Sequence, residues 1–409
     1  MPLSAQSGFA FAEGGVVAAG GFVCAGVHCG LKAEGRRDLA LIVAEKGSVP
    51  AAAVFTTNAI AAACVNVSRE HISTGECRAV VINAGNANAC TGAQGEKDAE
   101  AMATGVASAL GCSPREVIVC STGVIGVPLP LETVLSGIAD AAGALDSATG
   151  DSAAEAIMTT DTFAKQVAVS VMVDGRRVTV GGMAKGSGMI APNMATMLSV
   201  ITTDAPLTSD ACDAVLRSAA DLTFNRVTID SDTSTNDTVV LMASGDAGGD
   251  TIDVGDEVLS VVAGAVLCVC TELARMLARD GEGATKLVTV TVSGAATESD
   301  ALLAARSIAD SPLVKTALFG RDANWGRVAM AVGKSGAAVD PSALGITFAG
   351  IEVCRTGAAV PFNEDDALGA LSEDEVSIEA FLGSGASSAT VLTCDFSYDY
   401  VRINGEYRS

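Results

Sequence analysis

Histidine, tryptophan and aromatic residues in general are scarce in this 409-residue chain. It holds two histidines, one tryptophan and only 4% aromatic residues in total. No C-x-x-C pair accompanies His28 or His71, so the ligand spacing of a zinc site is missing and we expect no metal. A Ser-His-Asp hydrolase is also disfavoured, because the motif G-x-S-x-G is absent. The core is expected to consist mainly of Ala, Val, Leu and Ile.

Basic side chains are also few. The 25 Lys and Arg residues stand against 48 Asp and Glu residues, which gives a formal net charge of −23. Binding to nucleic acid or to an anionic membrane requires a local basic patch, and the sequence has no Lys/Arg cluster, so we expect neither partner. The N-terminus lacks a basic segment followed by an apolar one, and no apolar run is expected to span a bilayer. These absences predict a soluble cytoplasmic protein.

Cysteine, by contrast, is abundant, but its twelve positions follow no regular spacing. We therefore expect most cysteines to be small buried hydrophobic residues rather than disulfide partners.

Two segments resemble nucleotide-binding loops but lack the flanking residues that such loops require. Gly333-Lys334-Ser335 lacks the first glycine of a phosphate loop, and residues 186–191 are followed by Pro192 instead of a helix. No nucleotide cofactor is expected.

The hydrophobic pattern predicts strands and helices that alternate along the chain. Asp174-Gly175 favours positive φ and therefore predicts a tight hairpin that leads to Lys185. Strands are predicted within residues 39–47, 51–58, 79–88, 117–127, 197–201, 227–230, 238–242 and 287–292, with a strand and turn region over 318–332. Helices are predicted over residues 95–110, 209–222, 256–278 and 300–308.

The segment from Gly181 to Asp204, GGMAKGSGMIAPNMATMLSVITTD, is the most specific part of the sequence. Within it, Ala195-Thr196 joins a loop rich in Gly and Pro to a hydrophobic β segment. Thr196 has two readings: it starts a strand, or it becomes a nucleophile once the bond before it is broken. An N-terminal threonine needs no histidine, since its own α-amino group, with a pKa of about 7.7–8.0, accepts the hydroxyl proton.

This segment resembles the ornithine acetyltransferase family, the glutamate N-acetyltransferases of arginine biosynthesis, which cleave themselves between Ala and Thr. The resemblance extends along nearly the whole chain. Its motifs are VFTTN at 54–58, NAGNANACTG at 83–92, STGVIG at 121–126, MTTDT at 158–162, FNRVTIDSDTSTNDT at 224–238, DGEGATK at 280–286, GRDANWGR at 320–327 and the terminal YVRINGEYRS. One departure is Ser231, which stands where the family commonly has glycine.

The resemblance implies a self-processing acetyltransferase that is split into residues 1–195 and 196–409. It implies that Thr196 takes the acetyl group from N2-acetyl-L-ornithine and passes it to L-glutamate by a ping-pong route without a cofactor. Family members associate as α2β2 heterotetramers. Some also accept acetyl-CoA as donor, and no residue here decides that point. The implied fold is a mixed α/β body of stacked β-sheets flanked by helices, as in certain self-cleaving aminopeptidases, with a smaller C-terminal α/β lobe.

Residue roles follow from the same resemblance. Thr122 and Gly123 match the oxyanion pair, and Lys185 matches a substrate-binding lysine suited to an α-carboxylate. The carboxylate of Glu282 is expected to pair with an amino group of the substrate. The resemblance also implies that Thr159 and the C-terminal pair Asn404 and Ser409 contact the substrate. Thr160 and Thr162 lie so close to Thr159 that the sequence alone does not show which of the three makes this contact.

Two rival functions remain open at this point. The first is a self-cleaving aminopeptidase or amidohydrolase of the same fold, in which water takes the acyl group. The second is a relative that binds acetylated amino acids without cleaving itself. The sequence does not decide structural domain boundaries or regulation.

Overall fold

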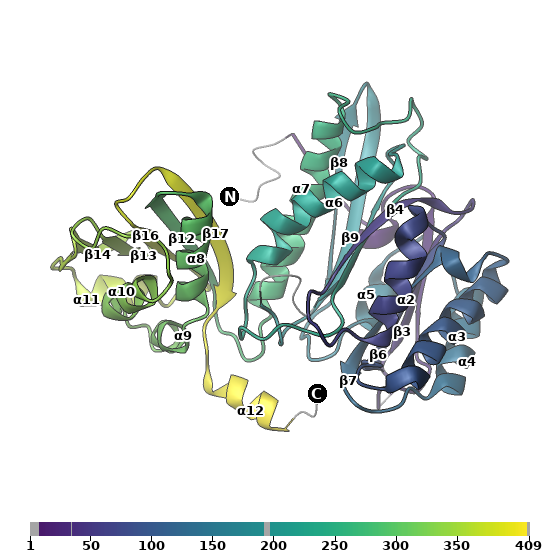
Figure 1. Ribbon diagram of the computed structural model, residues 1–409, viewed down its shortest axis with the longest axis horizontal. Helices are drawn as coiled ribbons and strands as arrows, with labels where there is room; N and C mark the ends of the chain where they lie inside the picture. Colours follow the sequence, from purple (N-terminus) through teal and green to yellow (C-terminus); the bar gives the residue numbers. More distant parts are fainter. Residues whose placement is uncertain (1–7, 34, 192–196, 407–409) are drawn as a thin grey trace.

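The computed structural model describes residues 8–33, 35–191 and 197–406. It forms a larger body built on two sheets and a smaller C-terminal lobe built on a third (Figure 1). This is the mixed α/β architecture with a smaller C-terminal lobe that the sequence predicted.

The seven-stranded sheet runs through the centre of the body. Its order is β1 (Ala10–Ala12), β8 (Lys165–Val173), β9 (Arg176–Lys185), β10 (Leu198–Thr203), β11 (Thr238–Ala243), β4 (Val49–Phe55) and β5 (Glu76–Cys77). Helices α6 (Ser209–Leu222) and α7 (Leu259–Arg279) pack against it. The β8–β9 hairpin turns at Asp174 and Gly175, both with positive φ, which confirms that prediction.

The four-stranded sheet has the order β2 (Phe22–Val27), β3 (Leu39–Ala44), β6 (Ala79–Asn86) and β7 (Val117–Val124). Helices α2 (Ala63–His71), α3 (Gly92–Leu110) and α4 (Leu131–Gly143) cover it, and α5 (Asp151–Ala156) contacts β2 and β3. Ile42 and Ile82 of this sheet share one buried cluster with Met183, Val200 and Met242 of the seven-stranded sheet. The two sheets therefore stack face to face between outer layers of helices.

The C-terminal lobe has its own core. Its six-stranded sheet has the order β15 (Ala358–Ala359), β14 (Ile351–Arg355), β13 (Gly345–Phe348), β16 (Glu375–Phe381), β12 (Leu287–Ala295) and β17 (Ser387–Cys394). Its helices are α8 (Glu298–Ala309), α9 (Pro312–Phe319), α10 (Trp325–Gly333) and α11 (Glu364–Ala370). The last helix, α12 (Tyr398–Glu406), leaves this lobe and lies beneath the space between the lobe and the body (Figure 1).

Two predicted strands are wrong. Residues 227–230 form no strand: Val227 makes an isolated bridge to Leu392, and the Asp230 carboxylate accepts the backbone N–H groups of Met189 and Ile190. A side chain that bonds the backbone in this way competes with strand pairing. Residues 318–332, predicted as strand and turn, instead belong largely to helices α9 and α10, whose N-cap side chains are Ser311 and Asn324.

The expectation that no apolar segment could span a bilayer also needs correction. By length and composition, α7 passes that test, with 21 residues and a mean hydropathy of 1.8 in its most apolar window. More than half of that window is buried inside the protein, and α7 packs on β8 and β9. Its apolarity is that of a core helix.

Cysteine placement agrees with the sequence prediction. All twelve cysteines are free thiols and nine of them are buried. They contribute to the cores as small apolar side chains.

Candidate active site

Residues from both sheets of the body, from the loop after α7 and from α12 meet around one narrow polar pocket. Its cavity volume is about 80 Å³. The candidate residues Thr122, Gly123, Thr159, Lys185, Glu282 and Asn404 all line it. They come from positions up to 282 residues apart in the chain, and the structure brings them together. We call this cavity the polar pocket.

Thr122 and Gly123 lie in the last part of β7. Strand β7 runs parallel to β6, with Gly123 paired to Gly85 before a register shift. Gly123 has a φ of 130°, and a Cβ at this position would lie 2.3 Å from the carbonyl carbon of Gly85. Glycine is therefore required there. The close approach orients the backbone beside the Thr122 hydroxyl, which is mostly buried.

Lys185 ends β9 and points its ammonium into the polar pocket. The Lys185 Nζ donates a hydrogen bond to Thr122 Oγ1 at 3.3 Å, and the side chain is 3% exposed. Burial lowers the pKa of the Lys185 ammonium, and the charge of Lys165 lowers it further, whereas Asp161 acts in the opposite direction. The lysine therefore keeps its charge only through nearby carboxylates, and an anionic substrate group would strengthen that support.

A buried ion cluster lies next to Lys185. The ammonium of Lys165, fully buried, contacts Asp161 Oδ1 at 2.6 Å and Asp280 Oδ2 at 2.5 Å. Asp161 also accepts the backbone N–H of Gly186 at 2.7 Å. Burial alone would raise the pKa of Asp161, but the charges of Lys185 and Lys165 hold it below its usual range. The cluster thus supports the glycine bend that follows Lys185.

The three neighbouring threonines, Thr159, Thr160 and Thr162, have different hydrogen-bond partners. The hydroxyl and the backbone N–H of Thr162 both bond Asp280. Thr160 Oγ1 lies 2.6 Å from Ser187 Oγ. Thr159 donates its backbone N–H to Asp161, and its hydroxyl has no protein partner within the described part of the chain. Thr159 is accordingly the threonine best placed to offer its hydroxyl to a ligand.

Glu282 and Asn404 close the opposite side of the polar pocket. The Glu282 carboxylate accepts a hydrogen bond from Asn404 Nδ2 at 2.8 Å, and the Glu282 backbone N–H donates to Ser187 O at 2.7 Å. A Cβ on Gly188 would lie 2.5 Å from the Glu282 carboxyl group. The glycine therefore lets the carboxylate lie directly against the bend that carries Lys185.

Asp237 is a further functional candidate that the sequence reasoning missed. Its Oδ1 accepts the backbone N–H of Met197 at 2.9 Å, while its Oδ2 is buried and has no partner among the described residues. Burial raises the pKa of Asp237 well above its usual range. Asp161, Lys165 and Asp280 were missed as well. Three of these four lie inside motifs already quoted, MTTDT, DGEGATK and STNDT, where only their acidic character could have signalled a role.

Three expectations lie outside the described residues. They concern Ala195, Thr196 and Ser409. Met197, the residue after the expected cleavage site, is buried, and its carbonyl accepts the backbone N–H of Thr238 at 3.2 Å.

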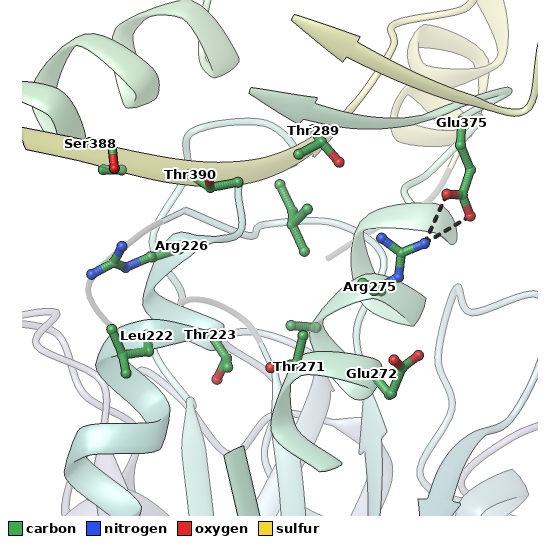
Figure 2. A pocket seen from close by; sticks show the side chains of 13 residues that line it. Leu222, Thr223, Arg226, Thr271, Glu272, Arg275, Thr289, Glu375, Ser388 and Thr390 are labelled. Carbon is green, nitrogen blue, oxygen red and sulfur yellow. Dashed lines mark hydrogen bonds and ion pairs between the residues drawn. The ribbon is translucent and has the colours of Figure 1, made fainter. Parts of the chain in front are cut away.

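A larger cavity lies elsewhere, between α6 and α7 of the body and strands β12 and β17 of the C-terminal lobe (Figure 2). Its volume is about 790 Å³. We call it the groove. Its arginines are already paired, Arg275 with Glu375 and Arg226 with Glu298. None of the described candidate residues lines it. The arginines of the groove are paired with carboxylates, whereas the polar pocket holds the buried Lys185 ammonium beside Thr122 and Gly123, so the polar pocket is the better candidate site.

Comparison with known proteins gives consistent relatives over almost the entire length. The sequence profile of the ArgJ family matches residues 23–409. The "Arginine biosynthesis bifunctional protein ArgJ" of Symbiobacterium thermophilum is 51% identical over 97% of this chain and 99% of its own. The protein of the same name from Geobacter sulfurreducens is 47% identical over 95% and 99%.

A solved structure is also similar. The crystal structure of the arginine biosynthesis bifunctional protein ArgJ from Bacillus halodurans shares 43% identity, with a TM-score of 0.51. The match covers 52% of this chain and 100% of the solved one.

Proposed function

The chain belongs to the ArgJ family and is an acetyltransferase of arginine biosynthesis, and from this premise we propose that the polar pocket transfers an acetyl group from N2-acetyl-L-ornithine to L-glutamate. The observation that carries the proposal is the convergence of Thr122, Gly123, Lys185 and Glu282 on one pocket. This set offers oxyanion donors, a cation and a carboxylate, which is what an acylated amino acid requires.

The chain is proposed to be cleaved between Ala195 and Thr196, which frees Thr196 as an N-terminal nucleophile. Two observations support this. The matching chain of the Bacillus halodurans structure is covered completely by about half of this chain, and residues 196–409 are just over half of it. In addition, Lys185 of β9 pairs with Leu198 of β10 in antiparallel register, so the two products would share the central sheet. Hydrogen bonding across β9 and β10 would hold them together.

In the first half-reaction, the Thr196 hydroxyl attacks the acetyl carbonyl of acetylornithine while the Thr196 α-amino group takes its proton. The resulting oxyanion accepts hydrogen bonds from the Thr122 hydroxyl and the Gly123 N–H. Collapse of the intermediate breaks the C–N bond, the proton passes to the departing amine, and ornithine leaves. The acetyl group remains as an ester on Thr196.

In the second half-reaction, the amine of glutamate attacks this ester through the same oxyanion geometry and leaves as N-acetylglutamate. Lys185 is proposed to bind the α-carboxylate that both substrates share. Glu282, held by Asn404, is proposed to bind the side-chain ammonium of ornithine. Thr159 and Ser409 complete the proposed substrate contacts. The name "bifunctional" of the relatives supports acetyl-CoA as a second acetyl donor.

The proposed assembly is an α2β2 heterotetramer that acts in the cytoplasm. Light scattering on the purified protein would test the assembly, with a mass near twice that of the 40.8 kDa chain expected. A mass of one chain would contradict it.

The deciding experiment combines intact mass measurement, N-terminal sequencing and an acetyl-transfer assay on the wild type, Thr196→Ala and the exposed control Thr104→Ala. We expect two wild-type fragments, one of which starts Thr196-Met197-Leu198, and acetylglutamate formed faster than free acetate. Thr196→Ala is expected to remain uncut and inactive, since one hydroxyl serves both reactions, while Thr104→Ala behaves as wild type. Transfer by uncut Thr196→Ala protein would overturn the proposal, and free acetate as the main product would indicate a hydrolase.

A further inference from the structure

Three basic side chains gather on one loop of this strongly acidic protein. Lys32, Arg36 and Arg37 lie between β2 and β3, where Lys32 is half-buried and the two arginines are exposed. The sequence holds no basic run of the length that nucleic acid requires, and the net charge is −23. Three cations within six residues therefore contrast with the acidic composition of the chain, and the groups that lie near them determine which ligands they could bind. We call it the basic loop.

The basic loop packs directly behind the oxyanion strand. A Cβ on Gly85 would lie 3.2 Å from Leu31, and Gly85 is itself the close neighbour of Gly123. Leu31, Gly85 and Gly123 thus form a continuous chain of contacts from the loop to the polar pocket. On the other side, Lys32 Nζ donates to Ala156 O at 2.9 Å, three residues before Thr159.

Electrostatics place the basic loop close to the same pocket. Burial lowers the pKa of Lys32 to about 8, and the charges of Asp38, Arg36, Lys185 and Asp161 act on it as well. An interaction with Lys185 and Asp161 means that Lys32 lies within reach of the pocket's own charges. Among the described residues, the Lys32 ammonium donates hydrogen bonds to the backbone carbonyls of Arg37 and Ala156 and to no carboxylate.

Within residues 28–38, the three cations Lys32, Arg36 and Arg37 outnumber the two carboxylates, Glu34 and Asp38. Asp38 is buried and accepts the backbone N–H groups of Cys29, Gly30, Leu31 and Lys32, so it shapes the loop from inside. Arg37 pairs with Glu155, and both side chains are exposed. The guanidinium of Arg36 has no hydrogen-bond or ion-pair partner among the residues that the structure describes.

We propose that Lys32, Arg36 and Arg37 bind the phosphate groups of acetyl-CoA when it replaces acetylornithine as the acetyl donor. The inference rests on the proposed function and adds the donor's binding surface. Acetylornithine and glutamate are small and present their charges inside the polar pocket. Acetyl-CoA also carries phosphates at the far end of a long flexible arm, so it needs cations outside the pocket but beside it, and guanidinium forks suit phosphate oxygens.

The reaction at this donor balances without a further reactant. The Thr196 oxygen forms a bond to the acetyl carbon, and the bond from that carbon to the CoA sulfur breaks. The hydroxyl proton, held by the Thr196 α-amino group, passes to the sulfur, and CoA leaves as the thiol. The resulting acetyl-threonine is the same intermediate that acetylornithine forms, so the acceptor step is shared.

The test measures KM and kcat for three donors, acetyl-CoA, acetyl-pantetheine and acetylornithine, with glutamate as acceptor. Arg36→Ala is compared with Arg36→Lys and with Arg177→Ala. Arg177 is an exposed arginine on β9 that lies eight residues, or roughly 26 Å, from Lys185 along the strand. Acetyl-pantetheine carries the same thioester without phosphates, and transfer from acetylornithine reports that each variant is folded and processed.

We expect Arg36→Ala to raise KM for acetyl-CoA at least about tenfold, the loss of one charge-assisted contact. KM for acetyl-pantetheine and for acetylornithine should stay unchanged, Arg36→Lys should restore part of the effect, and Arg177→Ala should match wild type. Glu155→Gln, which releases Arg37 from its ion pair, should lower KM for acetyl-CoA by about two- to threefold.

Two outcomes would overturn the inference and remain distinguishable. Equal KM values for acetyl-CoA in Arg36→Ala, Glu155→Gln and Arg177→Ala would remove the basic loop from donor binding and leave the proposed function intact. A wild-type enzyme that transfers from acetylornithine but from neither thioester would remove acetyl-CoA as a donor altogether. Loss of acetylornithine transfer in the wild type would instead overturn the proposed function itself.

Discussion

The groove and the polar pocket differ in size by about tenfold, and the smaller one holds the proposed site residues. In the groove, both arginines form ion pairs near the surface: the Arg275 and Glu375 side chains are 33% and 64% exposed. In the polar pocket, Lys185 is buried beside a carboxylate cluster that holds Asp161 charged. Water screens the first set of charges but not the second, so only the second acts strongly on a substrate. Three matched pairs of variants and one further substitution would sharpen or break this comparison.

The largest expected effect is on stability. Lys165→Met leaves Asp161 and Asp280 buried without their cation, so we expect a loss of about 3–5 kcal/mol in the free energy of unfolding. Arg275→Met removes an exposed pair in the groove and should cost about 1 kcal/mol or less. Urea unfolding of both variants measures the difference. Equal losses would show that burial does not distinguish the two cavities.

The next effect is on the chemical step. Thr122→Val keeps the shape of a buried side chain but removes the proposed oxyanion donor, so kcat for acetyl transfer should fall about 10²–10³-fold. Thr390→Val makes the same change in the wall of the groove and should leave kcat unaltered. Steady-state kinetics at saturating acetylornithine and glutamate provide the measurement. A fall of less than tenfold for Thr122→Val would remove that hydroxyl from the oxyanion site.

A smaller effect is expected on substrate affinity. Glu282→Gln removes the negative charge that we propose binds the ornithine ammonium, so KM for acetylornithine should rise about tenfold. The Asn404 amide would then face another amide instead of a carboxylate. Glu272→Gln, a matched change in the groove, should leave KM as it is. If KM moved equally in both variants, the proposed contact with Glu282 would be wrong.

The smallest effect is a displacement of the pH profile. Because burial lowers the pKa of Lys185, its ammonium is lost at a lower pH than that of an ordinary lysine. Activity at limiting acetylornithine should therefore fall on the alkaline side, and Lys185→Arg, which stays protonated, should move that fall to higher pH. Profiles of kcat/KM against pH test this. An alkaline limb unmoved by the substitution would assign it to another group.

Local sequence signals predicted most helices and strands of the body, because hydrophobic periodicity and capping residues lie within the elements themselves. Helix α6 matches its predicted bounds, and α3 ends at Gly111, a left-handed C-cap with a φ of 68°. The failures have non-local causes. At 227–230, Asp230 is engaged by backbone groups some 40 residues away. The apolarity of α7 is explained by burial, which sequence windows do not register.

Ser231 shows how a departure from a family pattern acquires a physical meaning. Where the family commonly has glycine, this serine adopts a φ of 64°, a left-handed conformation that costs a residue with a Cβ about 1–2 kcal/mol. The sequence therefore indicated the position correctly as one of unusual loop geometry. The strain is local and lies outside the catalytic groups.

By itself, the sequence determined the family, the stacked-sheet architecture, the expected nucleophile and the residues of the polar pocket, because motifs preserve which side chains a reaction needs. Only the tertiary structure showed that the hydroxyls of Thr160 and Thr162 bond protein side chains and that Lys165 joins Asp161 to Asp280. It alone also brought the basic loop against the oxyanion strand. The physical reason is that charge, burial and pKa depend on neighbours that lie a hundred or more residues apart, and folding alone makes them neighbours.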